Sequence, residues 1–261
     1  LDFNFPWHDC LQPIAENYLA VERAVAECAY AGCETIWIVC NDDMQPLIRH
    51  RLGEYAQDPV YVNRVYDTGN IGDNNRVVPI YYVPIHPKDR DRRDCLAWSV
   101  LYGANTAHYV SKKISKWVTP DRFYTAFPYG VYDPKILREH RKDISTGNGF
   151  FMRSSDKRTV ADGEYLGFTF SPDEFKKYRR HLRQTSTGGY EKAAGEIPTN
   201  KLPLEERYSA RHFSLDKVFG IAHTSEAKLV NVPDYYNIGS WDGLRNYLGS
   251  EHRIHRPKAI L

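Results

Sequence analysis

The chain has 261 residues and a formal net charge of +2, because 35 basic residues stand against 33 acidic ones. A charge so close to zero supplies no global field for nucleic acid or an anionic membrane, so neither is expected as a partner. The length and the 42% hydrophobic content suffice for one large α/β domain with a buried core. The sequence shows no run of 18 apolar residues and no signal peptide, so we expect a cytoplasmic protein.

The cysteines indicate a reducing environment. Their number is odd, and none of them forms a CxxC pair, which argues against a disulfide framework and against a zinc knuckle. A cluster of three cysteines between residues 28 and 40 is better explained by buried thiols than by a metal site. The sequence therefore predicts free thiols at Cys10, Cys28, Cys33, Cys40 and Cys95.

Helices and strands alternate along the first half of the chain. Apolar side chains recur at helical spacing over residues 17–31, and Gly32 ends this predicted helix. The next segment, TIWIVC at 35–40, is a short continuous apolar run, which is typical of a strand buried on both faces. The pattern then predicts a helix at 43–54, a strand at 77–85, a helix at 94–117, a strand at 123–128 and a helix at 134–142.

After residue 143 the regular alternation of predicted helices and strands ends. Glycines separate short strands, YLGFTF at 165–170 leads into a polar helix at 172–183, and residues 185–212 are rich in Gly, Pro and charge, which predicts a long loop or lid. The alternation before residue 143 predicts an α/β fold with a mixed, mainly parallel sheet between two helical layers. We expect one domain over 1–261.

Three passages occur in the order found in one enzyme family. They are DCLQPIAENYLAVERAV followed by AGCETIWIVC, then LGFTFSPDEF at 166–175, and finally YYNIGSWDGL at 235–244. They resemble the "PKPLLPI", "GIYVFSPEIF" and "W.DIGTPEDY" passages of the sugar-1-phosphate nucleotidyltransferases. The resemblance implies a Rossmann-like three-layer α/β/α sandwich of the nucleotide-diphospho-sugar transferase type. It also implies a nucleotide-binding half at 1–143 and a sugar-binding or C-terminal subregion at 144–261.

The resemblance places the chemistry at a few positions. These enzymes need a Gly-rich cradle, a lysine or arginine, and magnesium held by aspartates, because negative charge grows in the transition state. Here Asp9 stands at the family's lysine position, and no "GxGTR" cradle lies in the residues before it. Tyr129 stands at the first aspartate position, with Asp133 four residues later, and Asn237 stands at the second. We expect the main cleft at the ends of the strands 35–40 and 123–128, with these three residues lining it, because ligands of open α/β sheets bind beyond the carboxyl ends of strands.

Asp156 and Lys157 offer a further candidate contact. They align with a Glu-Lys pair that contacts the sugar phosphate in the family, while a solvated charged hairpin explains them equally well. No residue is predicted as a catalytic group or as a metal ligand. Together these positions predict a nucleotidyltransferase-like protein that binds a nucleotide or nucleotide-sugar and whose magnesium-dependent transfer is lost or altered.

Two alternatives stay open. One is a non-catalytic scaffold for interaction or assembly, and a homo-oligomer would fit that class. The other is an active sugar-1-phosphate nucleotidyltransferase, using Mg²⁺, whose Gly-rich loop is missing from the N-terminal side of this sequence. The base, the sugar and the oligomeric state are not specified by the residues.

Overall fold

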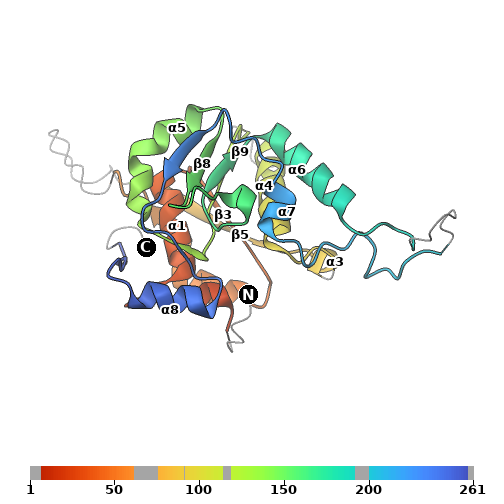
Figure 1. Ribbon diagram of the computed structural model, residues 1–261, viewed down its shortest axis with the longest axis horizontal. Coiled ribbons are helices and arrows are strands. Elements are labelled where there is room, and N and C mark those ends of the chain that lie inside the picture. The colour runs from red at the N-terminus through yellow and green to blue at the C-terminus, as the bar shows by residue number, and fades with distance from the viewer. Residues whose placement is uncertain (1–6, 62–75, 91, 114–118, 192–199, 258–261) are drawn as a thin grey trace.

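The computed structural model describes residues 7–61, 76–90, 92–113, 119–191 and 200–257 (Figure 1). Its helices, including three 3-10 segments labelled η, are η1 Asp9–Leu11, α1 Ala20–Ala31, α2 Gln45–Leu52, α3 Pro87–Arg90, α4 Leu96–Lys113, η2 Pro134–His140, α5 Arg141–Thr146, η3 Val160–Asp162, α6 Pro172–Thr185, α7 Leu215–Phe219 and α8 Trp241–Gly249. Its strands are β1 Pro13–Ala15, β2 Tyr18–Leu19, β3 Ile36–Cys40, β4 Tyr55–Gln57, β5 Val77–Pro84, β6 Phe123–Thr125, β7 Gly130–Val131, β8 Phe150–Arg153, β9 Phe168–Phe170, β10 Lys228–Asn231 and β11 Tyr236–Asn237.

Two larger sheets organise the described strands. One has the order β3-β5-β4 and the other the order β10-β8-β9-β6, while β1 pairs with β2 and β11 with β7. The α/β class and the mixed sheet are confirmed. Parallel pairing joins β3 to β5 and β10 to β8, and the remaining described pairs are antiparallel. The antiparallel share is larger than the sequence suggested, in part because β8 and β9 are joined without the long helical crossover that parallel strands need.

Helices cover the sheets on two sides. Helix α1 packs against β4 and β6, and α4 packs against β3 and is itself covered by α6 and α7. Figure 1 shows α1 on one side of β3 and β5 and α4 on the other, so that the strands lie between helices. Among the described helices, none combines the length and the apolar character that a membrane crossing needs.

The predicted elements recur with shifted bounds. The first helix begins at Ala20 instead of residue 17, because the residues before it form the short β1-β2 pair. It ends where predicted, since Gly32 adopts the left-handed φ of 86° that closes a helix. The predicted helix over 94–117 is observed to Lys113, and its last residues lie outside the described part. The predicted loop at 185–212 leaves the body of the molecule as a long excursion between α6 and α7, whose tip at 192–199 is not described (Figure 1).

Strand β3 differs from expectation in burial. Only Ile36 is buried, and residues 37–40 are half-buried, so this strand is not covered on both faces as its apolar run predicts. The reason lies in the sheet, because β3 is an edge strand of its sheet.

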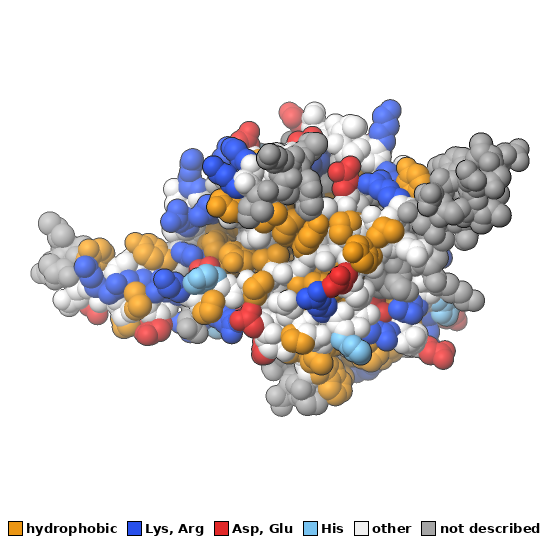
Figure 2. Space-filling view, turned by 180° about the vertical axis from the view of Figure 1, so that it is seen from behind, with side chains coloured by type: hydrophobic (Ala, Val, Ile, Leu, Met, Phe, Trp, Pro, Cys, Tyr) orange, Lys and Arg blue, Asp and Glu red, His pale blue; other side chains and the backbone are white. Residues whose placement is uncertain are grey.

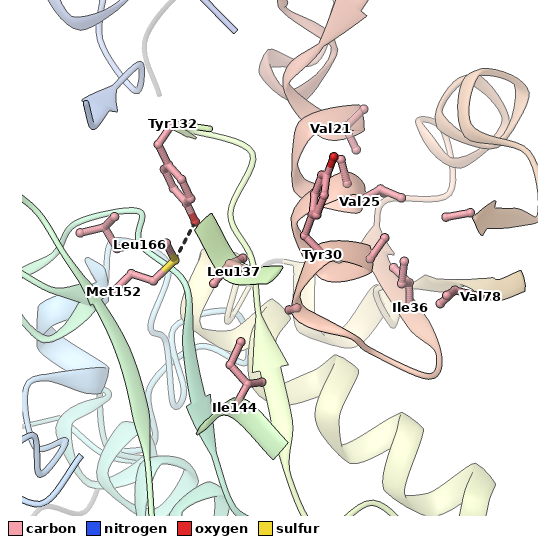
Figure 3. Packing of buried hydrophobic residues seen from close by; sticks show 14 of the residues in the cluster. Val21, Val25, Tyr30, Ile36, Val78, Tyr132, Leu137, Ile144, Met152 and Leu166 are labelled. Atoms are coloured by element: carbon pink, nitrogen blue, oxygen red, sulfur yellow. Dashed lines mark hydrogen bonds between the residues drawn. The ribbon is translucent and has the colours of Figure 1, made fainter. Parts of the chain in front are cut away.

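The main core lies between α1 and the strands (Figure 3). Val21 and Val25 on α1 join Ile36 and Val78 on one side, and Tyr132 donates a hydrogen bond to the Met152 sulfur at 3.2 Å on the other. This cluster fixes α1 relative to the start of β3 and to the segment that follows β7. It therefore positions the edge of the sheet at which the candidate residues gather.

Candidate functional site

A cavity of about 1860 Å³ runs along β3 and β6. Its lining includes all of β3, residues 122–129 around and after β6, and parts of α1 and α4. The sequence predicted a cleft beyond the carboxyl ends of these two strands, and the observed cavity includes that region but continues along the strands themselves. The face seen in Figure 2 carries a band of hydrophobic side chains across its middle, with Lys and Arg gathered beside it.

Asp9 lies at one end of the cavity. It opens the short helix η1, is half-buried and lines the cavity together with His8 and Cys10. Cys10 packs in the main core near Cys40, the last residue of β3. Burial, with a smaller contribution from Cys40 and Asp9, raises the pKa of Cys10 to about 12. These contacts place η1 at the carboxyl end of β3.

Tyr129 lies beside η1 and also lines the cavity. It is buried, with 4% of its surface exposed, and its ring meets that of Tyr165 edge-on with centroids 5.4 Å apart. Burial, followed by the nearby Cys10 and Asp9, raises the pKa of the Tyr129 hydroxyl far above its usual range. The hydroxyl therefore stays neutral at physiological pH.

Asn237 is brought next to Tyr129 from more than 100 residues away. Asn237 in β11 pairs with Gly130 in β7, and the Ile238 amide donates to the Tyr129 carbonyl at 2.9 Å. The alignment predicted this proximity, and the geometry agrees with it, but Asn237 is exposed and does not line the cavity, contrary to its predicted place there. The role of either residue in binding stays a prediction.

Glu164 organises the surroundings of Asn237, and sequence reasoning did not identify it. Its Oε2 accepts hydrogen bonds from the Asn237 amide at 3.2 Å and from the Tyr235 hydroxyl at 3.0 Å, and its Oε1 pairs with Arg158 at 2.8 Å. The residue is 8% exposed. The sequence did contain one indication of its importance, because Glu164 directly precedes the YLGFTF segment. A carboxylate next to a buried strand needs hydrogen-bond or ion-pair partners.

Three other predicted site residues, Asp133, Asp156 and Lys157, lie outside the cavity lining. Asp133 caps η2 by accepting a hydrogen bond from the Lys135 amide at 3.0 Å, is 57% exposed, and does not line the cavity, which contradicts its predicted place in the cleft. Asp156 and Lys157 form an exposed turn after β8, with Lys157 in the left-handed region at φ 63°. They too are absent from the lining, so the solvated hairpin describes their environment.

The residues at the aspartate positions do not fit a magnesium ion. Tyr129 is neutral and buried, and the Asn237 side-chain oxygen already accepts the Gly239 amide at 2.9 Å. A hard dication prefers several oxygen ligands with negative charge among them. In the part of the chain that the structure describes, no group of three His, Cys, Asp or Glu side chains is placed to hold a metal.

The two ends of the cavity differ in their charges. Asp9 and Asp94 lie at the end that holds the carboxyl termini of β3 and β5, whereas the opposite end, before β3, β5 and β6, carries both signs, with Glu34, Arg76, Asp121 and Arg122. Arg141 also lines the cavity, but its guanidinium donates two hydrogen bonds to the Asp58 carboxylate. A phosphate at the Asp9 end would therefore meet a carboxylate instead of a cation.

No protein-family model matches the chain, and no curated protein matches it either. Among solved structures, a crystal structure of UDP-glucose pyrophosphorylase complexed with UDP-glucose is similar to this chain, with 11% sequence identity and a TM-score of 0.46. The similarity covers 92% of this chain and 88% of that one. At this level it concerns the fold alone.

Proposed function

We propose that this chain binds a nucleotide or nucleotide-sugar at the end of the cavity that Asp9 and Tyr129 line, beside Asn237, and that it does not carry out magnesium-dependent nucleotidyl transfer. The observation that supports binding is the placement of these residues. Asp9 and Tyr129, which the sequence resemblance assigns to one site, both line this cavity, and Asn237, from a distant segment, lies next to Tyr129 through the pairing of β11 with β7. Ligands of open α/β sheets bind beyond the carboxyl ends of strands.

The loss of transfer chemistry follows from the same residues. Transfer requires charged groups aimed at the α-phosphorus and its leaving group, and each such group typically contributes about 10²–10³-fold to the rate. Here the lysine position is a carboxylate, the first metal position is a buried neutral phenol, and the second is an amide whose oxygen is already bonded. With UTP or ATP, Mg²⁺ and a hexose 1-phosphate, we expect no pyrophosphate above background.

Calorimetric titration tests the binding. UDP-glucose, ADP-glucose and GDP-mannose are each titrated into the wild type and into Asp9→Lys, with and without Mg²⁺. Asp9→Lys should tighten binding about fivefold, because it replaces a repelling charge with a partly exposed cation near the phosphates.

The matched control is Glu226→Lys, which makes the same charge change at an exposed residue before β10 that does not line the cavity. It should leave the affinity unchanged. Flat titrations for wild type and Asp9→Lys alike would refute the proposal and favour the scaffold alternative. Equal tightening by both variants would show that net charge, and not the cleft, governs the binding.

A further inference from the structure

Two cysteines face each other where α1 ends. Cys28 lies in the last turn of α1, and Cys33 follows Gly32, whose left-handed φ closes the helix. The Gly32 amide donates to the Ala29 carbonyl at 3.2 Å, and the Cys33 amide donates to the Cys28 carbonyl at 3.1 Å. Helices that end with these two bonds frequently bring the side chains of the outer pair into contact. Here the outer pair consists of two free thiols, which we call the α1 dithiol.

The backbone holds the α1 dithiol at disulfide distance. Given the 3.1 Å hydrogen bond and standard bond lengths, the Cα atoms of Cys28 and Cys33 lie at most about 7 Å apart. Disulfides join Cα atoms that are about 4.4–6.8 Å apart. The two thiols are also hydrogen-bonded to each other, and this bond, followed by burial, raises the pKa of Cys28 well above its usual range. A small side-chain adjustment is therefore enough to join the two sulfurs.

Reagents can reach this pair from the cavity. Cys28 and Cys33 are both half-buried, and both line the cavity. Glu34, directly after Cys33, is exposed, and β3 begins two residues further on at Ile36. The pair thus lies toward the amino end of β3, at the other end of this strand from the Asp9 region. The inference is therefore independent of the proposed nucleotide site.

The other three cysteines differ in their surroundings. Cys10 and Cys95 are buried, and burial raises the pKa of both thiols. Cys40 is half-buried, but Cys10, which lies near it, is not accessible. Since the thiolate is the reactive form of cysteine, buried thiols with a raised pKa react slowly with reagents from solution. Cys28 escapes this limit only in an intramolecular step, where the neighbouring sulfur is present at a high effective concentration.

We propose that Cys28 and Cys33 form a dithiol-disulfide pair that is oxidised reversibly by low-molecular-weight disulfides. Cys33, after losing its proton to water, attacks one sulfur of the reagent and releases the first thiolate. Cys28 then loses its proton to water and attacks the Cys33 sulfur of the mixed disulfide, which closes the bridge and releases the second thiolate. Two protein thiols are oxidised, and one reagent disulfide is reduced to two thiols. An excess of a thiol reductant reverses both steps.

Mass spectrometry tests the bridge. Reduced protein is incubated with glutathione disulfide at pH 8, denatured in iodoacetamide and cleaved after glutamate. Cleavage after Glu27 and Glu34 releases residues 28–34, which contain Cys28 and Cys33 and no other cysteine. This peptide should be recovered without alkylation and lighter by two hydrogen atoms, and it should form at least about tenfold faster than a bridge between any other two cysteines. Dithiothreitol should restore the alkylated form.

Single replacements separate the two steps. Cys28→Ser should stop the reaction at a glutathione adduct on Cys33, because no second thiol displaces it. Cys33→Ser should slow the loss of the remaining thiol at Cys28 by at least about tenfold, because its raised pKa disfavours the thiolate. Cys40→Ser is the matched control, since Cys40 is half-buried and lines the same cavity, and it should leave the rate of bridging unchanged.

A second reagent measures proximity without oxidation. Phenylarsine oxide bonds two neighbouring thiols through arsenic and releases water, so the wild type and Cys40→Ser should bind it at least about tenfold more tightly than Cys28→Ser or Cys33→Ser. If a serine variant fails to fold, the peptide analysis of the wild type still decides. Bridges that form equally fast between other cysteines, a stable glutathione adduct on Cys33 of the wild type, or arsenical binding that survives Cys28→Ser would each overturn the proposal.

Discussion

Arg23 and Glu27 form an ion pair, with 2.8 Å between Nη1 and Oε2, and both side chains are completely buried. Arg23 also donates a hydrogen bond to the Phe127 carbonyl, and the Glu27 carboxylate accepts one from the Tyr124 hydroxyl at 2.7 Å. Since Tyr124 and Phe127 belong to β6 and the segment after it, the pair ties α1 to the strand that borders the cavity. Removing one partner leaves an uncompensated charge inside the protein.

Glu27→Ala should therefore lower the free energy of unfolding by about 3–5 kcal/mol. The double replacement Arg23→Met with Glu27→Leu should recover most of that loss, because it removes both charges and keeps the volume apolar. Urea unfolding measures both. As a control, Lys176→Ala breaks an exposed pair with Asp173 and should cost at most about 1 kcal/mol. A double variant as unstable as Glu27→Ala would show that the hydrogen bonds, and not the paired charges, hold α1 in place.

Gly130 allows the close approach on which the candidate site depends. A Cβ at this position would lie 1.9 Å from the Tyr165 carbonyl oxygen and 3.1 Å from the Tyr235 ring. Gly130→Ala must therefore push β7 away from Tyr165 and Tyr235, and we expect a loss of about 1–3 kcal/mol of stability together with any ligand binding at this edge.

Gly249 supplies the matched control, because it ends α8 and a Cβ there would meet nothing within 4 Å. Gly249→Ala should be neutral or stabilising by up to about 1 kcal/mol. Thermal unfolding of Gly130→Ala and Gly249→Ala measures the two changes in stability. Equal stability of Gly130→Ala and wild type would mean that the β7-β11 pair shifts freely.

Several features of the fold could be predicted from local sequence. Gly32 marks the end of α1 because only a residue without Cβ adopts its left-handed φ easily. The meeting of Tyr129 and Asn237 was predictable only through the resemblance, since no periodicity links residues so far apart. The half-buried state of β3 was not predictable, because an apolar run reports what a strand prefers to contact and not which neighbours the sheet provides.

The candidate site likewise combines features that the sequence could predict with features that it could not. Asp133 was placed in the cleft from its position after a strand, but its side chain turns back to cap η2. Asp residues that precede a helix commonly do this, and the Pro134 that follows is a helix-start signal that weighed against a role in the cleft. Glu164 was missed because its partners, Tyr235 and Asn237, come from the other end of the chain. A single carboxylate in sequence does not reveal partners that only the fold brings to it.

Stability should fall at high pH. Burial raises the pKa of Cys10 from 9.0 to about 12 and that of Cys40 from 9.0 to about 11. Below pH 9 these thiols are neutral in both states, so their contribution to stability is fully present. Above pH 9 the unfolded chain loses the protons while the folded chain retains them, and the contribution is lost as the pH rises through 11 to 12.

Urea unfolding at pH 8, 9.5 and 11 should therefore show a progressive decrease, and Cys10→Ala should reduce it. The same burial predicts that Cys10 reacts with iodoacetamide at pH 8 only as fast as the protein opens, because the thiolate is the reactive form. Immediate alkylation of Cys10 in the folded protein would contradict both expectations.

The last prediction concerns the amide at the second aspartate position. The Asn237 amide donates to Glu164 Oε2 at 3.2 Å, so Asn237→Asp would place a second carboxylate, at an exposed position, in contact with Glu164, which is itself 8% exposed. Without a cation we expect a loss of about 1–3 kcal/mol, since a favourable hydrogen bond is replaced by repulsion. Two adjacent carboxylates are also oxygen ligands suited to Mg²⁺ or Ca²⁺, so added MgCl₂ or CaCl₂ should raise the melting temperature of this variant and leave that of the wild type unchanged.

Asn200→Asp is the matched control. Asn200 donates to Glu191 at 3.3 Å in the same manner, but both residues lie on the exposed excursion after α6, where water screens the charges. It should show neither the loss nor the cation response. Differential scanning fluorimetry with a magnesium titration distinguishes the two variants, and a wild-type-like response of Asn237→Asp would mean that Arg158, which already pairs with Glu164 at 2.8 Å, neutralises the added charge without a metal.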